Sequence, residues 1–510
     1  MPYSSQLLLL IASLSPLTND KKSQASGSCA EDLRKVIEPI VDQVCQLVAE
    51  IQQQPLTPTQ ACRFEQELRE RVREVGRVVA QWTYNQAEPT VETLPKHVWF
   101  ESMEYTRLNE KTPQNVWTLF GQVRLWRVGY RPTSKTGDAT IFPLALSLGL
   151  VQGATPALAE RASWYLGSSG MTQNQTLERL RQDHGVSCGV KKLRQISGAV
   201  AAATAEQRHD VQVEKVLEWL KQASATTGKH KPVLSVGRDG ITLGTRFKGG
   251  SVFEVATTGT VTVFDRRGRR LGTVYLAYTP EFGQKTMSNA LTQLLQDVLR
   301  RWDGLLPRLC YVTDAGDNET TYFDKILKRM NHPVTGAKLE WSRVVDYYHA
   351  SERVWKIAEL LFGKGQRSTS WARKMQKWLL KPGGVNRVLH SAAALRDLYR
   401  LRGTKLTEFG KAYRYLRDRM QYMDYAKYKA LGIPRGSGVT EAACKTVYTQ
   451  RLKLSGMRWT RPGAQTILNL RVLQLSGVWE AAYTAVLERF DEPQVRGQTA
   501  PKASHARKAA

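Results

Sequence analysis

Three acidic residues in distinctive local settings could together carry out chemistry on phosphate esters. Asp239 lies in VGRDG and Asp314 in YVTDAGD, each within or just after a short apolar run typical of a β-strand. Glu441 lies in RGSGVTEAACK, at the start of a predicted helix rich in Lys and Arg. Two strand carboxylates and one helix carboxylate can hold two divalent ions about 3.5–4 Å apart, as in-line displacement at phosphorus requires. These acids are therefore the predicted catalytic metal ligands.

The expected metal is Mg²⁺, with Mn²⁺ able to substitute, because hard cations prefer carboxylate oxygens and no His or Cys cluster competes in the sequence. Asp239 is expected to bridge both ions. Each acid also has a structural interpretation. Asp239 precedes Gly240 and could belong to a turn, Asp317 could take the place of Asp314, and Glu441 could serve the helix dipole.

Basic residues follow Glu441 within one to five helical turns, where they could hold DNA phosphates. They are Lys445, Arg451, Lys453 and Arg458. Trp459 comes next, and its indole could stack on an unpaired base or close a buried helix end.

The motif DYYHA, with Asp346 and His349, ends the last predicted strand of the same region. His349 could orient a phosphate or the nucleophile, or make a structural hydrogen bond. Both residues are included in the predicted catalytic set.

The composition predicts a nucleic-acid partner. The chain has 510 residues, 74 Lys and Arg against 46 Asp and Glu, and a formal charge of +28. Such a charge favours a polyanion through counterion release. An apolar content of 42% excludes general disorder. The six cysteines form no CxxC pair, which argues against disulfides and zinc and predicts reduced thiols in a cytoplasmic protein.

The first 230 residues are predicted to be mainly helical. A disordered leader (1–28) precedes a helical region (29–115) that begins with two helices broken at Pro55 and Pro58, and a β-hairpin region (116–154) turns at Gly121. Residues 155–230 resemble a helix-turn-helix region. The outward face of its third helix, expected to end near residue 207, carries the predicted DNA contacts Lys191, Lys192 and Arg194.

From residue 231 the predicted fold is α/β. The pattern to residue 349 reads as three strands, helix, strand, helix, strand, which is the order of a ribonuclease-H-like sheet. That order places Asp239 on the first strand beside Asp314 at the end of the fourth. A helical insertion (350–435), the last part of the core (436–490) and a basic disordered tail (491–510) complete the predicted organisation.

The motifs RDG, TDAGD, DYYHASERVW and GSGVTEAACKTVYTQRLKLSGMRW resemble the signature blocks of bacterial insertion-sequence DDE transposases. The likeness is greatest to the ISKra group, related to Mutator-like elements, and spans roughly residues 116–479. The resemblance implies that Asp239, Asp314 and Glu441 are the metal-binding triad and that Asp346 and His349 form an accessory D-x-x-H motif. YRPTSKTGD lacks the cysteine pair common in related chains, so no zinc knuckle is expected.

The preferred hypothesis is a Mg²⁺-dependent transposase that cleaves the ends of its element and joins them to target DNA. Its expected partners are double-stranded DNA (terminal inverted repeats and target) and at least a second copy of the chain; no membrane partner is expected, and the location is the bacterial cytoplasm at the nucleoid. Two alternatives remain: a structure-selective nuclease of the same fold, and a domesticated DNA-binding protein without catalysis.

Overall fold

The computed structural model describes residues 22–53, 55–100, 103–134, 139–247 and 250–491, which form two compact units. The first unit comprises residues 1–166, 171–200 and 483–510, and the second comprises 167–170 and 201–482. Residues 1–21 of the predicted leader and almost all of the predicted tail lie outside the described residues. Residues 22–28 were predicted to be disordered, but they are helical.

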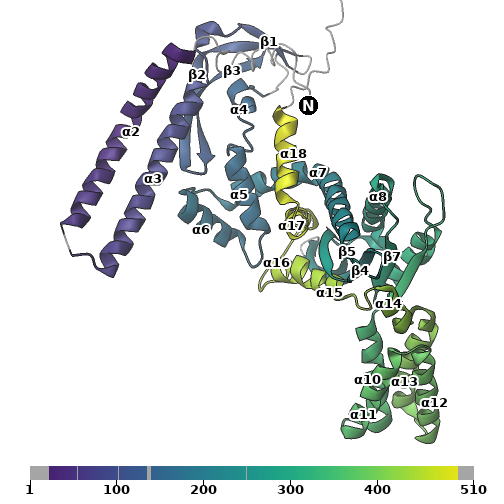
Figure 1. Ribbon diagram of the computed structural model, residues 1–510. Coiled ribbons are helices and arrows are strands. Elements are labelled where there is room, and N and C mark those ends of the chain that lie inside the picture. Colours follow the sequence, from purple (N-terminus) through teal and green to yellow (C-terminus); the bar gives the residue numbers. More distant parts are fainter. Residues whose placement is uncertain (1–21, 54, 101–102, 135–138, 248–249, 492–510) are drawn as a thin grey trace, which may run out of the picture. The chain divides into compact units, whose positions relative to one another are not determined.

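Two long antiparallel helices begin the first unit, α2 (Lys22–Gln52) and α3 (Pro58–Gln86) (Figure 1). The predicted break between them is present. Thr57 starts α3 with a capping box, in which its side chain accepts from the Gln60 N–H and the Gln60 side chain accepts from the Thr57 N–H. Pro58 occupies the first helical turn, where its missing N–H costs nothing.

The predicted β-hairpin at Gly121 is present, but it is part of a larger sheet. Strands β1 (His97–Phe100), β2 (Met103–Thr118) and β3 (Gly121–Pro132) pair in that order, all antiparallel. Strand β2 therefore begins at Met103, well before the predicted region starts at residue 116. Gly121 has φ +110°, a conformation that favours glycine at this turn.

The predicted helical trio follows a short helix, α4 (Pro143–Ser147). The trio consists of α5 (Pro156–Gly167), α6 (Gln173–His184) and α7 (Val190–Ala225). Leu193 and Ile196 are buried, as the predicted stripe requires. Helix α7 does not end near residue 207 but continues to Ala225, because this Ala-rich stretch contains no proline and only one glycine. It runs from the first unit, which holds residues to Val200, into the second.

A mixed five-stranded sheet forms the centre of the second unit. Its elements follow the predicted order along the chain: β4 (Val233–Phe247), β5 (Gly250–Phe264), β6 (Arg270–Tyr278), α8 (Lys285–Arg301), β7 (Arg308–Thr313), α9 (Asp317–Lys325) and β8 (Trp341–Val345). The spatial order is β6-β5-β4-β7-β8. The β6–β5 and β5–β4 pairs are antiparallel, whereas β4–β7 and β7–β8 are parallel.

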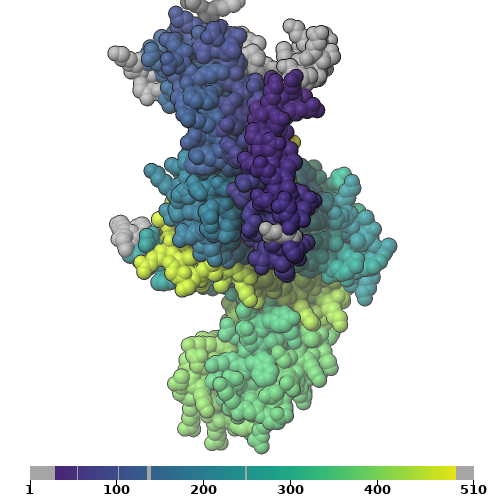
Figure 2. Space-filling model, turned by 90° about the vertical axis from the view of Figure 1, so that its left-hand side faces the viewer, coloured from purple at the N-terminus to yellow at the C-terminus, as the bar shows by residue number. Residues whose placement is uncertain are grey.

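The two faces of this sheet pack against different helices. Leu309 and Tyr311 of β7 join a core with α8, α9 and the second half of α7, while Cys310 and Val312 join a core with the helices that follow β8. This alternation is the normal consequence of the strand period of two. The helices after β8 are α10 (Tyr347–Phe362), α11 (Gln366–Leu379), α12 (Gly384–Leu398), α13 (Gly403–Asp418) and α14 (Tyr425–Leu431). They occupy the predicted insertion, seen as the bundle α10–α13 in Figure 1 and as the green body in Figure 2.

The chain then returns to the sheet. A helical segment made of α15 (Gly438–Ala443), a π-helical stretch (Cys444–Thr449) and α16 (Gln450–Leu452) precedes α17 (Arg461–Leu475) and α18 (Trp479–Asp491). Helix α17 lies along the edge strand β6, where the Gln465 side chain accepts from the Thr279 N–H and donates to the Ala277 carbonyl. None of the helices in the described residues has the length and apolarity needed to cross a membrane.

Candidate active site

Asp239 and Asp314 lie on neighbouring parallel strands, at the edge where the pairing ends. The last β4–β7 pair is Val236 with Tyr311, and each acid lies three residues beyond its member of that pair (239 − 236 and 314 − 311). Gly237 and Cys310 show which face they share. Gly237 faces Thr440 of α15, and Cys310 faces the insertion helices, so the odd-numbered β4 positions and even-numbered β7 positions point to one side. The predicted juxtaposition of the two aspartates is therefore present.

The backbone turn after β7 fixes Asp314 and is strained at the next residue, Ala315. Asp314 Oδ1 accepts a hydrogen bond from the Gly316 N–H at 3.0 Å, and the buried Ala315 between them has φ +61°. A left-handed non-glycine residue costs on the order of 1–2 kcal/mol and needs support from its surroundings. Helix α13 and its end supply that support: the Tyr415 hydroxyl donates to the Asp314 carbonyl at 2.7 Å, and Arg419 donates to the Ala315 carbonyl. The insertion thus helps to fix Asp314.

Asp317, the alternative to Asp314, is an exposed residue at the start of α9. Helix dipoles favour an acid at that position. Its location agrees with a helix-starting role and leaves Asp314 as the acid beside Asp239.

Gly237 of β4 lets helix α15, which carries Glu441, pack close to the strand that carries Asp239. A Cβ on Gly237 would lie 1.9 Å from Thr440 Oγ1, so only glycine lets α15 pack this closely on the strand. Thr440 also hydrogen-bonds the Thr260 hydroxyl of β5 at 2.8 Å in a buried contact. Glu441 follows Thr440 in the first turn of α15, with its side chain 46% exposed. The close helix–strand contact therefore anchors the third predicted ligand near the first.

The three acids interact electrostatically. Burial raises the pKa of Asp239, and the nearby carboxylates of Asp314 and Glu441 raise it further. Hydrogen bonds from the Gly240 N–H at 2.7 Å and from the Cys444 thiol at 3.3 Å partly offset this rise. Burial and the adjacent Asp239 raise the pKa of Cys444, which keeps it a neutral thiol. The site concentrates negative charge that a cation would relieve.

Asp346, a member of the predicted catalytic set, is a buried anchor for two segments of the chain. It is fully buried as the N-cap of α10, and Oδ1 accepts from the backbone N–H groups of Tyr348 and His349. Its Oδ2 accepts from both the backbone N–H and the hydroxyl of Ser437. Three backbone N–H groups thus donate to its two oxygens, and the Ser437 hydroxyl lies in contact with Oδ2.

His349 does reach the acids. Its Nε2 lies 3.3 Å from Glu441 Oε1, while its Nδ1 lies 3.2 Å from Glu352. Burial lowers the pKa of His349, but Asp346, Glu352 and Glu441 raise it by more, so the net shift is upward. The histidine is therefore suited to hold a carboxylate.

The donor set suits Mg²⁺, but the acids do not converge tightly. Three carboxylates are the chemistry that Mg²⁺ or Mn²⁺ prefers, and the raised pKa of the adjacent Cys444 keeps that thiol protonated. In the part of the chain that the structure describes, however, no three His, Cys, Asp or Glu side chains lie close enough together to hold a metal ion. Glu441 Oε1 is instead engaged by His349 and by the Ser437 hydroxyl at 2.9 Å.

The basic residues after Glu441 divide into exposed and buried groups. Lys445, Lys453 and Arg458 are exposed and remain predicted DNA contacts. Arg451 and Trp459 are buried and pack on each other, with the guanidinium 5.3 Å from the ring centroid. The Trp459 indole N–H donates to the Leu452 carbonyl at 3.0 Å. The predicted contacts of Arg451 and Trp459 with DNA are therefore wrong, because both side chains are buried in the protein interior. For Trp459 the alternative, a buried helix end, is the arrangement present.

The predicted contacts of the helix-turn-helix region lie at the start of α7, in the first unit. Lys191 and Arg194 are exposed, and Lys192 is half-buried with its ammonium 3.2 Å from the Gln152 carbonyl. Arg194 donates to the Gln173 side chain at 2.8 Å. Leu193, which lies among them in the sequence, is buried.

Sequence analysis missed three residues near the acids. Glu319 is buried, and burial followed by the nearby Asp314 raises its pKa. Cys444 lies one helical turn after Glu441, and Ser437 one turn before it. That i, i+4 spacing was a usable signal for Ser437, whereas the approach of Glu319 depends on the turn after β7.

No family model matches the chain. Among curated proteins, the chain is similar to the "UPF0236 protein in vanSb 3'region" of Streptococcus gallolyticus. The two are 26% identical over 380 residues, which cover 72% of this chain and 73% of that protein. The similarity therefore extends over most of both chains and is not confined to one domain.

Proposed function

We propose that the protein is a metal-dependent DDE transposase of an insertion sequence, in the ISKra group related to Mutator-like elements. The observation that carries the proposal is the meeting of Asp239, Asp314 and Glu441 at one edge of the mixed sheet, each from a different element. Two neighbouring strands and one helix supply an acid each, as phosphoryl transfer with two metal ions requires.

The sheet supports the finer assignment of a ribonuclease-H-like fold. Its order β6-β5-β4-β7-β8, with three antiparallel strands followed by two parallel ones, is the order of such a core. Along the chain, the first strand of this sheet, β4, carries Asp239 and the fourth, β7, precedes Asp314. The helical insertion enters after β8, between the second and third acids, as the resemblance to DDE transposases implies.

Asp239, Asp314 and Glu441 would hold Mg²⁺, or Mn²⁺ in its place. When bound, the metal would supply an activated oxygen nucleophile and stabilise the departing oxygen. The residues of the chain supply the rest. The strained turn and Tyr415 hold Asp314, Gly237 lets α15 approach, and His349 and Ser437 hold the Glu441 carboxylate.

The charge distribution supports DNA as the substrate. Residues 347–431, which form α10 to α14, contain 19 Lys and Arg against six Asp and Glu. Such a surface favours a polyanion. We propose that the insertion, the exposed Lys445, Lys453 and Arg458, and the start of α7 contact the element ends and the target. This activity would take place at the nucleoid in the bacterial cytoplasm.

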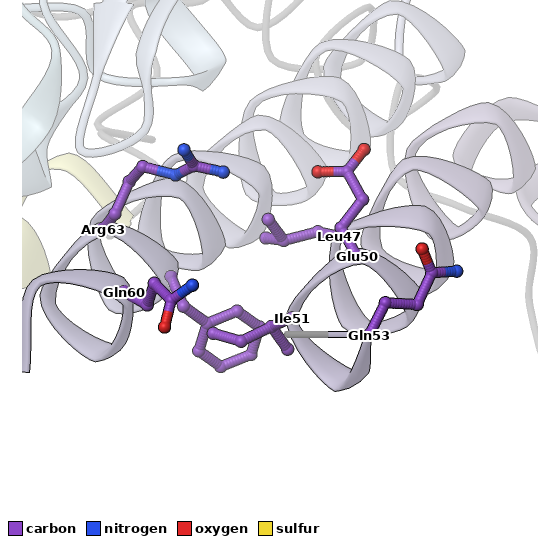
Figure 3. A pocket seen from close by; sticks show the side chains of 7 residues that line it. Leu47, Glu50, Ile51, Gln53, Gln60 and Arg63 are labelled. Atoms are coloured by element: carbon purple, nitrogen blue, oxygen red, sulfur yellow. The ribbon is translucent and has the colours of Figure 1, made fainter. Parts of the chain in front are cut away.

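We propose that the α2–α3 hairpin pairs two copies of the chain. Residues 29–86 contain seven Lys and Arg against nine Asp and Glu, so this segment does not share the basic character of the chain. No residue of α3 is buried, and Val41 and Val72 are 46% and 61% exposed. The turn end of the hairpin is hollowed between the helices, with Leu47 and Ile51 in its lining (Figure 3). Pairing with a second hairpin would bury the exposed Val41 and Val72 side chains.

Strand transfer separates the proposal from its alternatives. The purified chain is incubated with labelled DNA that carries the ends of its element, a target plasmid and Mg²⁺. A transposase cuts the ends and joins them to the target. Cutting without joining identifies a nuclease, and salt-dependent binding without either product identifies a non-catalytic DNA-binding protein. Either of these outcomes overturns the proposal.

A further inference from the structure

Ser437 links the buried anchor Asp346 to the exposed acid Glu441. Its hydroxyl lies 2.6 Å from Asp346 Oδ2 and 2.9 Å from Glu441 Oε1. A hydroxyl has one hydrogen, so it can donate to only one carboxylate at a time. The Ser437 backbone N–H donates to Asp346 Oδ2 independently of the hydroxyl, so Ser437 stays attached to Asp346 when its hydroxyl hydrogen turns to Glu441 Oε1.

Ser437 stands at the start of a helix, but its hydroxyl does not cap that helix. Ser437 is the N-cap of α15, where a serine side chain normally accepts from a backbone N–H two or three residues later. Here the side chain makes no such capping bond. The residue is buried, at 6% exposure, and its hydroxyl contacts two carboxylates instead. Stabilising the helix start therefore does not explain why a hydroxyl stands at this position.

The contacts to Glu441 fall on one oxygen. The Ser437 hydroxyl and His349 Nε2 both approach Oε1, at 2.9 and 3.3 Å. Asp346 holds both of these partners, through the Ser437 contacts and through the backbone N–H of His349. The arrangement joins the DYYHA motif to the helix of Glu441 and leaves Oε2 as the atom suited to face a cation.

We propose that Ser437 is the positioning residue of the metal site: Asp346 holds its backbone N–H, and its hydroxyl donates to Glu441 Oε1, so that Oε2 is presented to the divalent cation. The proposal rests on the function proposed above for Glu441. It assigns to Asp346 the role of anchoring Ser437 and His349, and it gives Ser437 no contact with DNA.

The test is Mn²⁺ binding to the full-length protein, measured by electron paramagnetic resonance after EDTA treatment and dialysis. Ser437→Ala is expected to weaken Mn²⁺ binding by about 10- to 100-fold, the usual cost of losing a group that orients a metal ligand. Ser437→Thr keeps the hydroxyl and is expected to restore most of the affinity. Glu441→Gln marks the loss expected when the ligand itself is removed, and thermal unfolding and DNA binding of every variant show that it folds.

Two results would overturn the proposal. One is a folded Ser437→Ala variant that binds Mn²⁺ as the wild type does while Glu441→Gln does not. The other is a Ser437→Thr variant that is folded but as defective as Ser437→Ala. Failure of the proposed function looks different. In that case the wild type binds Mn²⁺ in a Ser437-dependent manner, yet yields no cleaved or joined DNA.

Discussion

Asp239 and Asp314 occupy the same register on two neighbouring parallel strands, each three residues beyond the last paired residues, Val236 and Tyr311. Parallel strands present their carboxyl ends at one edge of a sheet, and acids at that edge face the same solvent region. Glu441 reaches the same edge from a helix that is 127 residues further along the chain (441 − 314). The site is thus set by the sheet register and by one helix–strand contact, and each can be tested.

Gly237→Ala tests the helix–strand contact. The added methyl would meet Thr440 Oγ1, so α15 must move away from β4 and carry Glu441 with it. We expect a loss of about 1–3 kcal/mol in the free energy of unfolding, as in other overpacked sites. DNA cleavage should fall by more than this loss of folded protein explains. Chemical denaturation and a cleavage assay measure the two effects.

Gly198→Ala is the matched control for that substitution. Gly198 lies inside α7, and a Cβ there meets no atom within 4 Å. Alanine in a helix interior is more stable than glycine by about 0.5–1 kcal/mol, so this variant should be slightly stabilised and fully active. If the two glycine variants behave alike, the close approach at Gly237 does not position Glu441.

Tyr415→Phe tests the support that the insertion gives to Asp314. The substitution removes the hydroxyl that donates to the Asp314 carbonyl at 2.7 Å and retains the aromatic ring. We expect a loss of about 0.5–1.5 kcal/mol in the free energy of unfolding, the net value of one hydrogen bond. Metal-dependent cleavage should fall while DNA binding is unchanged. Tyr413→Phe on the same helix is the control and should cleave as the wild type does.

Glu319→Gln tests whether the charge of the buried Glu319 lowers the stability of the folded protein. Burial and the nearby Asp314 raise the pKa of Glu319 above its ordinary value of 4.5. A carboxyl group whose pKa is raised by folding destabilises the folded state as the pH rises from the unfolded-state pKa to the folded-state pKa. Glutamine removes that cost, so the variant should unfold at a higher temperature than the wild type at neutral pH. At about pH 4 and below, where the acid is protonated in both states, the difference should vanish. A constant difference across this range would show that the effect is packing and not charge.

Arg458→Ala and Arg451→Ala test the division between exposed and buried cations. Arg458 is exposed, so its loss should weaken DNA binding and reduce the slope of log affinity against log salt by about one. Arg451 is buried against Trp459, so its loss should lower the unfolding temperature. Fluorescence anisotropy at several salt concentrations and thermal unfolding measure both. A reduced salt slope for folded Arg451→Ala would restore it as a phosphate contact.

Much of the second unit is predictable from the sequence because its signals are local. The apolar run of β7 is followed by Asp-Ala-Gly, and that of β4 leads to Asp-Gly inside a strand that continues to Phe247. The order of the strands along the chain predicts which strands are neighbours. The acids at their ends can therefore be paired from the amino-acid pattern alone. The insertion is predictable because the distance from Asp314 to Glu441 is too long for one sheet connection.

The rest depends on contacts between distant segments. Trp459 and Arg451 look like surface groups in a basic helix, and only the bridge between Thr245 and Trp459 shows that this segment folds back on β4. Ser437 looks like an ordinary helix cap until Asp346 is placed beside it. The length of α7 was underestimated because a helix without a break signal gives no indication of its end.

The assignment of Asp239, Asp314 and Glu441 to one catalytic metal site can be tested with four variants. Mg²⁺-dependent cleavage of DNA carrying the element ends is measured for Asp239→Asn, Asp314→Asn and Glu441→Gln, with Asp317→Asn as the control. Asp317 is three residues from Asp314 but is exposed at the start of α9. We expect each of the first three variants to bind DNA and yield no product, and Asp317→Asn to cleave as the wild type does. Cleavage by any of the first three at the wild-type rate, or its loss only in Asp317→Asn, would contradict the assignment.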